Sequence, residues 1–203
     1  MSKSNREFVD KNRDVSAYYA LRERFNGRNM AFIKREAKKL IEQDPDFLDW
    51  YILLYEMLKE QVNFKEADEI LDKAYKRALA LITDEDGNWP DLLEWGWLQN
   101  RHIIRTLLNK AISLWRNKQN EEALDLFRKL LKTNSTDNAG AREFILAIRM
   151  NVTYPEFERR FDKGGYYDKE LPDWFEEHYK KFPDEFEAWE KVMKEINGES
   201  SHT

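Results

Sequence analysis

Apolar positions recur at intervals of three and four residues along most of the chain, the spacing of one face of an α-helix. No stretch shows the alternation of apolar and polar residues that is typical of a half-buried strand. The pattern therefore predicts an all-α protein of about nine helices. The expected helices cover residues 13–25, the region of 33–41, 46–60, 65–82, 99–117, 120–132, 138–150, a short helix after Pro155 and two helices towards the C-terminus.

Proline and glycine mark the breaks between these helices. Pro45 bars continuation of the second helix, and Gly87 with Pro90 interrupts the pattern after the fourth. Residues 162–173 are expected to form a loop. The apolar residues expected to pack inward are Val15, Tyr18, Tyr19 and Phe25 in the first helix, and Phe186, Trp189, Val192, Met193 and Ile196 in the last.

The length of 203 residues fits one domain, expected over residues 13–197. The break near residues 83–99 is expected to be an insertion in this domain. Polar composition at the two ends predicts a flexible N-terminal tail over residues 1–12 and a flexible C-terminal tail over residues 198–203.

Pairs of helices joined by short turns favour a repeat architecture. Ile33 and Ala67 lie 34 residues apart (67 − 33), and each opens the buried face of the second helix of a pair. Residues 41–60 and 180–196 also share a design in which Pro-Asp is followed by phenylalanine and then by tryptophan inside a new helix.

The clearest unit is residues 109–138, NKAISLWRNKQNEEALDLFRKLLKTNSTDN. It resembles a tetratricopeptide repeat, with Ala111 in its first helix, Ala123 where the two helices touch and Phe127 four residues later. Alanine at the crossing lets two antiparallel helices approach closely. The resemblance implies an all-α fold of helix-turn-helix repeats that form a right-handed superhelix. An irregular helical bundle is the alternative.

The resemblance is more specific over residues 95–143. The marks that carry it are Trp95-Gly96, Asn100-Arg101, Leu114-Trp115, Glu122-Ala123 and Thr136-Asp137-Asn138-Ala139-Gly140-Ala141-Arg142. This segment is similar to poorly characterised tetratricopeptide-like proteins that include relatives of the suppressor of tumorigenicity 7 family. Thr136 stands where those proteins usually have asparagine. The resemblance implies a helical scaffold and brings no particular activity with it.

Composition narrows the class of protein. Charged residues are 36% of the chain and aromatic residues 14%, which suits helices with charged outer faces around a bulky core. There is no cysteine, and therefore no disulfide or thiol chemistry. The net charge of −5 argues against nucleic acid as the main ligand. Neither a signal peptide nor an apolar run long enough for a membrane span is evident, so the expected location is cytoplasmic, with no membrane partner.

Catalytic motifs are absent from the sequence. It contains no HExxH, no phosphate-binding GxxxxGK[ST] and no Gly-x-Ser-x-Gly. His102 and His178 are interpreted as hydrogen-bonded packing residues. We therefore expect no enzyme activity, no catalytic residue, no metal site and no cofactor. A small helical enzyme or metal-binding domain is the main alternative, and a single-strand RNA binder is a further one that the acidic balance disfavours.

Ligand binding has more support, because stacked helix pairs present their first helices along a concave groove. The side chains expected to face this groove are Arg105, Asn109, Arg116, Arg142 and Arg149. Arginine offers a planar fork for a carboxylate, and asparagine can pair with a backbone amide. The sequence therefore predicts a non-catalytic protein-interaction module or scaffold, whose partner is a protein or peptide with an acidic segment or a C-terminus.

Three tryptophans, Trp89, Trp95 and Trp97, lie close together in the expected insertion. Trp95 belongs to the shared Trp-Gly pair and is interpreted as a packing residue. Trp89 and Trp97 lie outside that pattern and are candidate ligand contacts. The apolar face of the last helix is also consistent with a homodimer.

Overall fold

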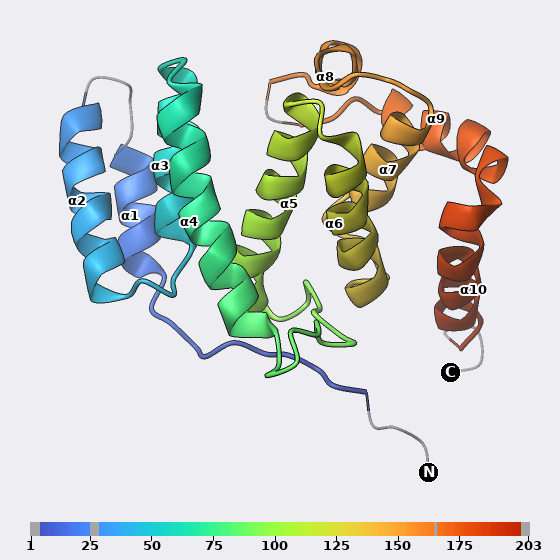
Figure 1. Cartoon of the computed structure of the whole chain (residues 1–203), viewed down its shortest axis with the longest axis horizontal. Helices are drawn as coiled ribbons and strands as arrows, with labels where there is room; N and C mark the ends of the chain where they lie inside the picture. Colours follow the sequence, from blue (N-terminus) through green and yellow to red (C-terminus); the bar gives the residue numbers. More distant parts are fainter. Residues whose placement is uncertain (1–4, 25–28, 165, 200–203) are drawn as a thin grey trace. The chain divides into compact units, whose positions relative to one another are not determined.

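A computed structural model describes residues 5–24, 29–164 and 166–199 of the chain (Figure 1). The described residues form ten α-helices and two short 3-10 turns, with isolated bridges but no strand among them. The all-α prediction is therefore confirmed. No helix in the described ranges has both the length and the apolar character to cross a membrane.

The chain divides into two compact units, Met1–Lys110 and Ala111–Thr203, and the division falls within α5 (Arg101–Arg116). The first unit contains α1 (Ser16–Arg24), α2 (Met30–Gln43), α3 (Asp49–Glu60), α4 (Phe64–Ile82), η1 (Leu98–Asn100) and the first turns of α5. The second contains the last turns of α5, α6 (Asn120–Thr133), α7 (Ala141–Arg149), α8 (Tyr154–Phe161), α9 (Glu170–His178), η2 (Tyr179–Lys181) and α10 (Pro183–Glu199). The single repeat domain expected over residues 13–197 stays a prediction.

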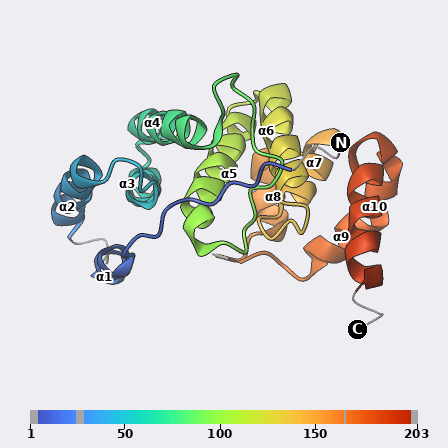
Figure 2. The same cartoon turned by 90° about the horizontal axis from the view of Figure 1, so that it is seen from below.

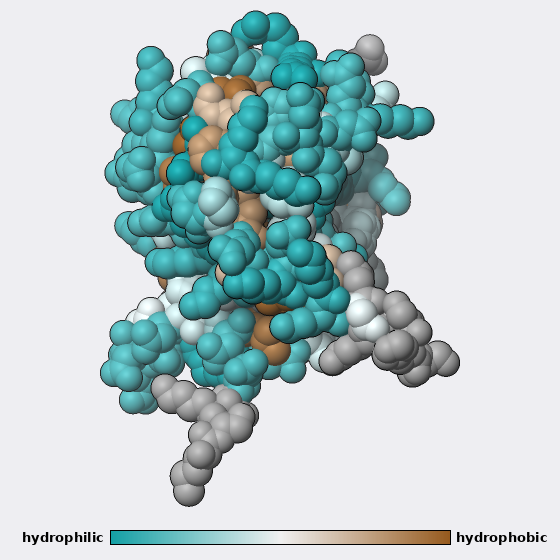
Figure 3. All heavy atoms as spheres, turned by 90° about the vertical axis from the view of Figure 1, so that its right-hand side faces the viewer, coloured by the Kyte–Doolittle hydropathy of each residue, from teal (hydrophilic) through white to brown (hydrophobic). Residues whose placement is uncertain are grey.

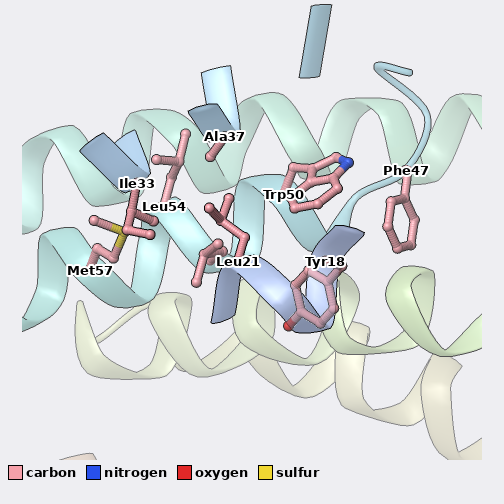
Figure 4. Close-up of a cluster of buried hydrophobic side chains, with 9 residues drawn as sticks. Tyr18, Leu21, Ile33, Ala37, Phe47, Trp50, Leu54 and Met57 are labelled. Carbon is pink, nitrogen blue, oxygen red and sulfur yellow. The ribbon is translucent and has the colours of Figure 1, made fainter. Parts of the chain in front are cut away.

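The core of the first unit forms around α3, which packs against α2 and α4. Side chains from α1, α2 and α3 meet in one cluster (Figure 4). Within it Tyr18 and Phe47 contact Trp50 edge to face, each with ring centroids 5.6 Å apart. Apolar residues nearly surround α3, so this helix is buried on most of its faces, as expected of a central helix.

Small residues bring α4 close to α3. Ala67, Ala74 and Ala78 are fully buried on α4, at spacings of seven and four residues that place them on one face. Asn63 caps the start of the helix by accepting a hydrogen bond from the Glu66 backbone N–H. The spacing of the small residues along this helix therefore matches the face that is buried in the structure.

An aromatic cluster fills the second unit. Trp115 contacts Phe144 and Phe157 edge to face, with centroids 6.0 and 5.4 Å apart, and Phe127 stacks on Phe144 at 5.1 Å. Ala123 on α6 has no exposed surface. The small residue and the aromatic residue of the clearest repeat unit are therefore both core residues.

Some residues expected to pack inward are exposed instead. On α1 only Tyr18 and Leu21 are buried, whereas Val15 is 41% and Tyr19 is 53% exposed, because this short helix begins at Ser16 and turns a single edge inward. Phe25 lies outside the described residues. On α10, Val192 and Ile196 are 37% and 39% exposed. Phe186 of the same helix is buried as expected.

The loop expected over residues 162–173 is shorter than predicted, because α9 begins at Glu170. Pro172 stands in the first turn of this helix. The first N–H groups of a helix have no partner within it, so a proline there costs no helical hydrogen bond. Pro172 is therefore compatible with the first turn of α9. At the other end of the unit, α10 extends to Glu199, and the rest of the expected C-terminal tail lies outside the described residues.

Replacing Ala123 with leucine should lower the free energy of unfolding by about 1–3 kcal/mol, because the added methyl groups meet a closed core. Chemical denaturation followed by circular dichroism measures this change. The same replacement of Ala80, an exposed alanine of α4, is the matched control and should change the stability little. Equal effects at both positions would show that Ala123 is not a close-packing position.

Candidate functional site

The N-terminal segment lies along the loop of residues 83–100 (Figure 2). The Phe8 backbone N–H donates to the Leu92 carbonyl at 2.9 Å. The Asn100 side chain, fully buried, donates to the Phe8 carbonyl at 2.8 Å and accepts from the Asp10 N–H at 3.0 Å. Arg6, Glu7 and Phe8 have hydrogen-bond partners within the expected insertion of residues 83–99. The flexible tail expected over residues 1–12 stays a prediction, and residues 1–4 lie outside the described part.

His102, Asp10 and Arg13 form a buried polar cluster next to these contacts. The Nδ1 atom of His102 accepts the Leu48 backbone N–H at 3.1 Å, so the proton of the neutral ring is on Nε2, which donates to Asp10 Oδ2 at 2.8 Å. Arg13 also binds the Asp10 carboxylate. Burial opposes the charged form of Asp10, but the bonds from His102 and Arg13 outweigh it and hold the pKa of this carboxyl below its ordinary value. His102 is therefore a buried side chain with both ring nitrogens hydrogen-bonded.

A cavity of about 160 Å³ opens beside this cluster, between the start of α1, Phe47 and the start of α5. Four cationic side chains line it: Lys11, Arg13, Arg101 and Arg105. Its volume is below the several hundred Å³ of a typical small-molecule or cofactor site. The cavity therefore suits a single side chain or a chain terminus of a ligand. We call it the cationic pocket.

Most of the positive charge in the cationic pocket is balanced within the chain. Arg105 forms a two-point ion pair with Asp49, in which its Nε atom lies 3.0 Å from Oδ1. Arg13 binds Asp10 and Asp44. Both pairs fix a guanidinium in one orientation and leave little charge for a ligand.

Arg101 is the exception. Its Nε donates to the Trp95 carbonyl at 3.1 Å, and its guanidinium lies over the Trp95 ring, 5.1 Å from the centroid. No ion pair or hydrogen bond to its two terminal nitrogens occurs within residues 5–24, 29–164 and 166–199. Arg101 therefore presents a held but uncompensated cation to the cationic pocket.

Three apolar side chains of the cationic pocket are exposed. Val15 is 41%, Tyr19 53% and Leu98 69% exposed. Large apolar side chains gathered at one cavity are typical of an interaction surface. The site thus combines one available guanidinium with an apolar rim.

The predicted site residues of the first unit fall in different places. Arg105 lines the cationic pocket, and the Asn109 side chain donates to the Arg105 carbonyl at 2.9 Å. Trp97 is 44% exposed, and its indole N–H donates to Glu7 at 2.6 Å. Trp89 is half-buried. Neither tryptophan lines the cationic pocket. Trp95, interpreted as a packing residue, instead contacts Arg101 of this pocket with its ring.

The predicted site residues of the second unit have partners on their own unit. Arg149 binds Asp184 at 2.6 Å and also Glu185, and it lies over the Phe182 ring. The Arg116 guanidinium is 3.4 Å from the Ser113 hydroxyl oxygen. A common groove of all five polar candidates stays a prediction.

The fifth candidate, Arg142, belongs to a buried charge cluster. It pairs with Glu143 at 3.0 Å and with Asp137 at 3.6 Å, and it lies over the rings of Phe175 and Trp189. Arg142 is partly exposed, and it already contacts two carboxylates and two rings.

Asp137 caps α7 in this cluster. Its carboxylate accepts the backbone N–H groups of Ala141 at 2.7 Å and Arg142 at 3.0 Å. Burial and the nearby charge of Glu143 raise the pKa of Asp137 to about 7, against the opposing effect of these bonds. The positive φ angles of Asp137 (48°) and Gly140 (74°) shape the turn. The hydrogen bonds that Asp137 accepts and these φ angles therefore give the turn before α7 its shape.

Sequence reasoning missed Arg101 and the apolar rim. Arg101 belongs to the Asn100-Arg101 pair quoted for the proposed resemblance, but no sequence pattern marked its side chain as a ligand contact. Tyr19 has the helical spacing of a core residue, so nothing in the pattern marked it as exposed. No cluster of three or more metal-binding side chains occurs in the part of the chain that the structure describes.

Comparisons of the chain with protein-family models, with curated proteins and with solved structures found no match.

Replacing Asn100 with alanine should lower the free energy of unfolding by about 1–3 kcal/mol, because the Phe8 carbonyl and the Asp10 N–H lose their buried partner. Amide exchange at Asp10 should accelerate as well. Thermal denaturation and hydrogen exchange measure the two effects. Asn12→Ala, at an exposed position of the same segment, is the control. Unchanged exchange at Asp10 would show that Asn100 does not hold the segment.

The raised pKa of Asp137 predicts a pH dependence of stability. The folded state holds the proton up to about pH 7, whereas an unfolded aspartate releases it near pH 4. The resulting stabilisation is complete below about pH 4 and is lost as the pH rises through about 7. Between pH 8 and pH 5.5 the free energy of unfolding should rise by about 2 kcal/mol, measured by urea denaturation.

Asp137→Asn should flatten this pH dependence, because the amide cannot ionise. Asp125→Asn, at a largely exposed carboxylate, should leave it unchanged. A slope of the same size in the Asp137 variant would assign the proton to another group.

Proposed function

We propose that the chain is a non-catalytic protein-interaction module that binds a peptide segment with an acidic group next to an apolar side chain. The observation that carries the proposal is the uncompensated guanidinium of Arg101 beside the exposed rim of the cationic pocket. A side-chain carboxylate or a C-terminal carboxylate supplies the acidic group.

The recognition is proposed to take place in two contacts. The carboxylate of the ligand accepts hydrogen bonds from the two terminal nitrogens of Arg101, in the planar arrangement that arginine favours. The neighbouring apolar side chain of the ligand covers Tyr19 and Leu98. The bond to the Trp95 carbonyl holds Arg101 before the ligand arrives, which reduces the entropy lost on binding.

Arg105 is given a supporting part in this proposal. Its two-point pair with Asp49 holds it at the wall of the cationic pocket. The Asp49 side chain is 3% exposed, so removal of the arginine would leave a buried carboxylate without its partner. Arg105 therefore stabilises the site, and Arg101 binds the ligand.

We further propose that the helices form a tetratricopeptide-like right-handed superhelix. The support is local: Ala111, Ala123 and Phe127 of the clearest repeat unit are all fully buried. This is the pattern expected where paired helices cross closely and an aromatic residue fills the adjoining space.

Binding of fluorescent peptides measured by anisotropy tests the proposed function. The probes carry an aromatic or leucine residue next to aspartate, and matched probes carry asparagine in place of the aspartate. Arg101→Gln should weaken binding of the acidic probe by about tenfold or more, since a hydrogen-bonded charge pair contributes about 1.5–3 kcal/mol.

Arg159→Gln, at an exposed arginine of α8, is the matched control and should bind like the unaltered protein. Tyr19→Ser should weaken both the acidic and the neutral probe. Equal affinity of the Arg101 variant and the unaltered protein for the acidic probe would overturn the proposal, as would equal affinity of the unaltered protein for both probes.

A further inference from the structure

Residues 6–13 run alongside the loop of residues 83–100, and we call them the strap. The Leu92 backbone N–H donates to the Arg6 carbonyl at 3.2 Å, and the Phe8 N–H donates to the Leu92 carbonyl at 2.9 Å. The loop contains no α-helix and no strand of its own. Its path therefore depends on the backbone bonds that the strap supplies.

The strap also fixes the part of the loop that holds Arg101. The indole N–H of Trp97 donates to Glu7 at 2.6 Å, and the Asn100 side chain bonds to the strap backbone in two places. Trp95, whose carbonyl and ring hold the guanidinium of Arg101, lies close to both of these anchors in the chain. The position of Arg101 is therefore linked to the docking of the strap.

The cationic pocket is built partly from the strap itself, since Lys11, Asn12 and Arg13 line it. Leu98, the most exposed residue of the apolar rim, belongs to the loop that the strap holds. Exposed apolar side chains are gathered at this rim, whereas on the side of the molecule that carries α10 apolar atoms form only a broken strip between polar side chains (Figure 3). Docking of the strap therefore sets both the charged wall and the apolar rim of this pocket.

Polar bonds, rather than apolar burial, hold the strap in place. Its only apolar residues are Phe8, which is half-buried, and Val9, which is 42% exposed. A segment near a chain end that buries little apolar surface belongs to the parts of a protein that open at low cost. The strap can therefore undock while the helices of the first unit stay folded.

We propose that the strap is a conformational device that assembles the peptide-binding site, so that the cationic pocket binds its ligand only while the strap is docked. Undocking removes three residues from the pocket wall and releases the loop that carries Trp95 and Leu98. Ligand binding and strap docking then favour each other, because a ligand that binds one of two states shifts the equilibrium towards that state. The inference rests on the proposed function and adds its regulation: whatever captures the free strap also releases the peptide.

Hydrogen exchange of the full chain, with and without the acidic peptide probe, tests this coupling. The Phe8 amide reports on the strap without touching the ligand, because neither Phe8 nor its acceptor Leu92 lines the cationic pocket. If the probe binds only the docked state, exchange at Phe8 should slow about a hundredfold at a free probe concentration of about 100 times Kd. The Lys118 amide, which donates to Trp115 in the second unit, should exchange at an unchanged rate.

A variant of the strap tests the coupling from the other side. Phe8→Ala should undock the strap more often, and the apparent Kd of the acidic probe should rise in proportion to the docked fraction that is lost. Exchange at Asp10 measures that fraction. Val9→Ala, at an exposed side chain of the strap, is the matched control and should change neither quantity. Neither side chain lines the pocket, so a loss of affinity cannot come from a lost contact with the probe.

The outcomes separate this inference from the proposed function. Normal binding of the acidic probe with unchanged exchange at Phe8 would overturn the coupling and leave the proposed function standing. Unchanged affinity in a Phe8→Ala variant whose docked fraction has fallen would do the same. If the acidic probe does not bind the unaltered protein at all, the proposed function is wrong, and the coupling is wrong with it.

Discussion

The buried amide of Asn100 is the contact on which the candidate site of the first unit depends. It joins two segments that are distant in sequence, since it bonds to the backbone of Phe8 and Asp10 from the turn that precedes α5. Asp10 can then meet His102, whose other ring nitrogen binds the Leu48 backbone. Together with the Phe8–Leu92 backbone bond, this side chain holds the N-terminal segment at one wall of the cationic pocket. These bonds are buried or partly buried, so losing one leaves polar groups with few alternative partners.

Sequence periodicity predicted the helices well because burial of an apolar face is a local pattern. The alanines of α4 and the Ala123–Phe127 pair are buried as their spacing indicates. The prediction of buried residues was less accurate where a helix buries only one edge, as in α1. Apolar residues on the exposed edge of such a helix follow the same spacing as those on the buried edge. Periodicity tells which residues share a face, but the neighbouring element decides which face is covered.

The candidate site was only partly predictable for a different reason. Arginine type and helical spacing were enough to single out Arg105, Arg142 and Arg149, but not to show that each meets carboxylates in the fold. The carboxylates that pair with Arg105 and Arg149 lie on other helices, and Asp137 lies across a turn from Arg142, so the helical pattern does not predict these pairs. Only Glu143 is a sequence neighbour of its arginine. Arg101 differs because its immediate neighbours are an aromatic ring and a carbonyl. An arginine is available to a ligand when no carboxylate of the protein pairs with it. Whether a carboxylate does so depends on the tertiary structure.

The net charge of −5 constrains how a cationic pocket of this kind can act. An acidic ligand approaches a chain of net negative charge, so long-range attraction to the whole chain does not assist the encounter. At physiological ionic strength this repulsion is screened beyond about 8 Å, whereas a direct bond to a guanidinium at the wall of a pocket is screened far less. Selectivity then arises from short-range geometry, and affinity depends mainly on how slowly the ligand leaves. Arg101 is rigidly held beside exposed apolar side chains. Its bond to a carboxylate and the apolar contact are both short-ranged, so they act only after the ligand has docked.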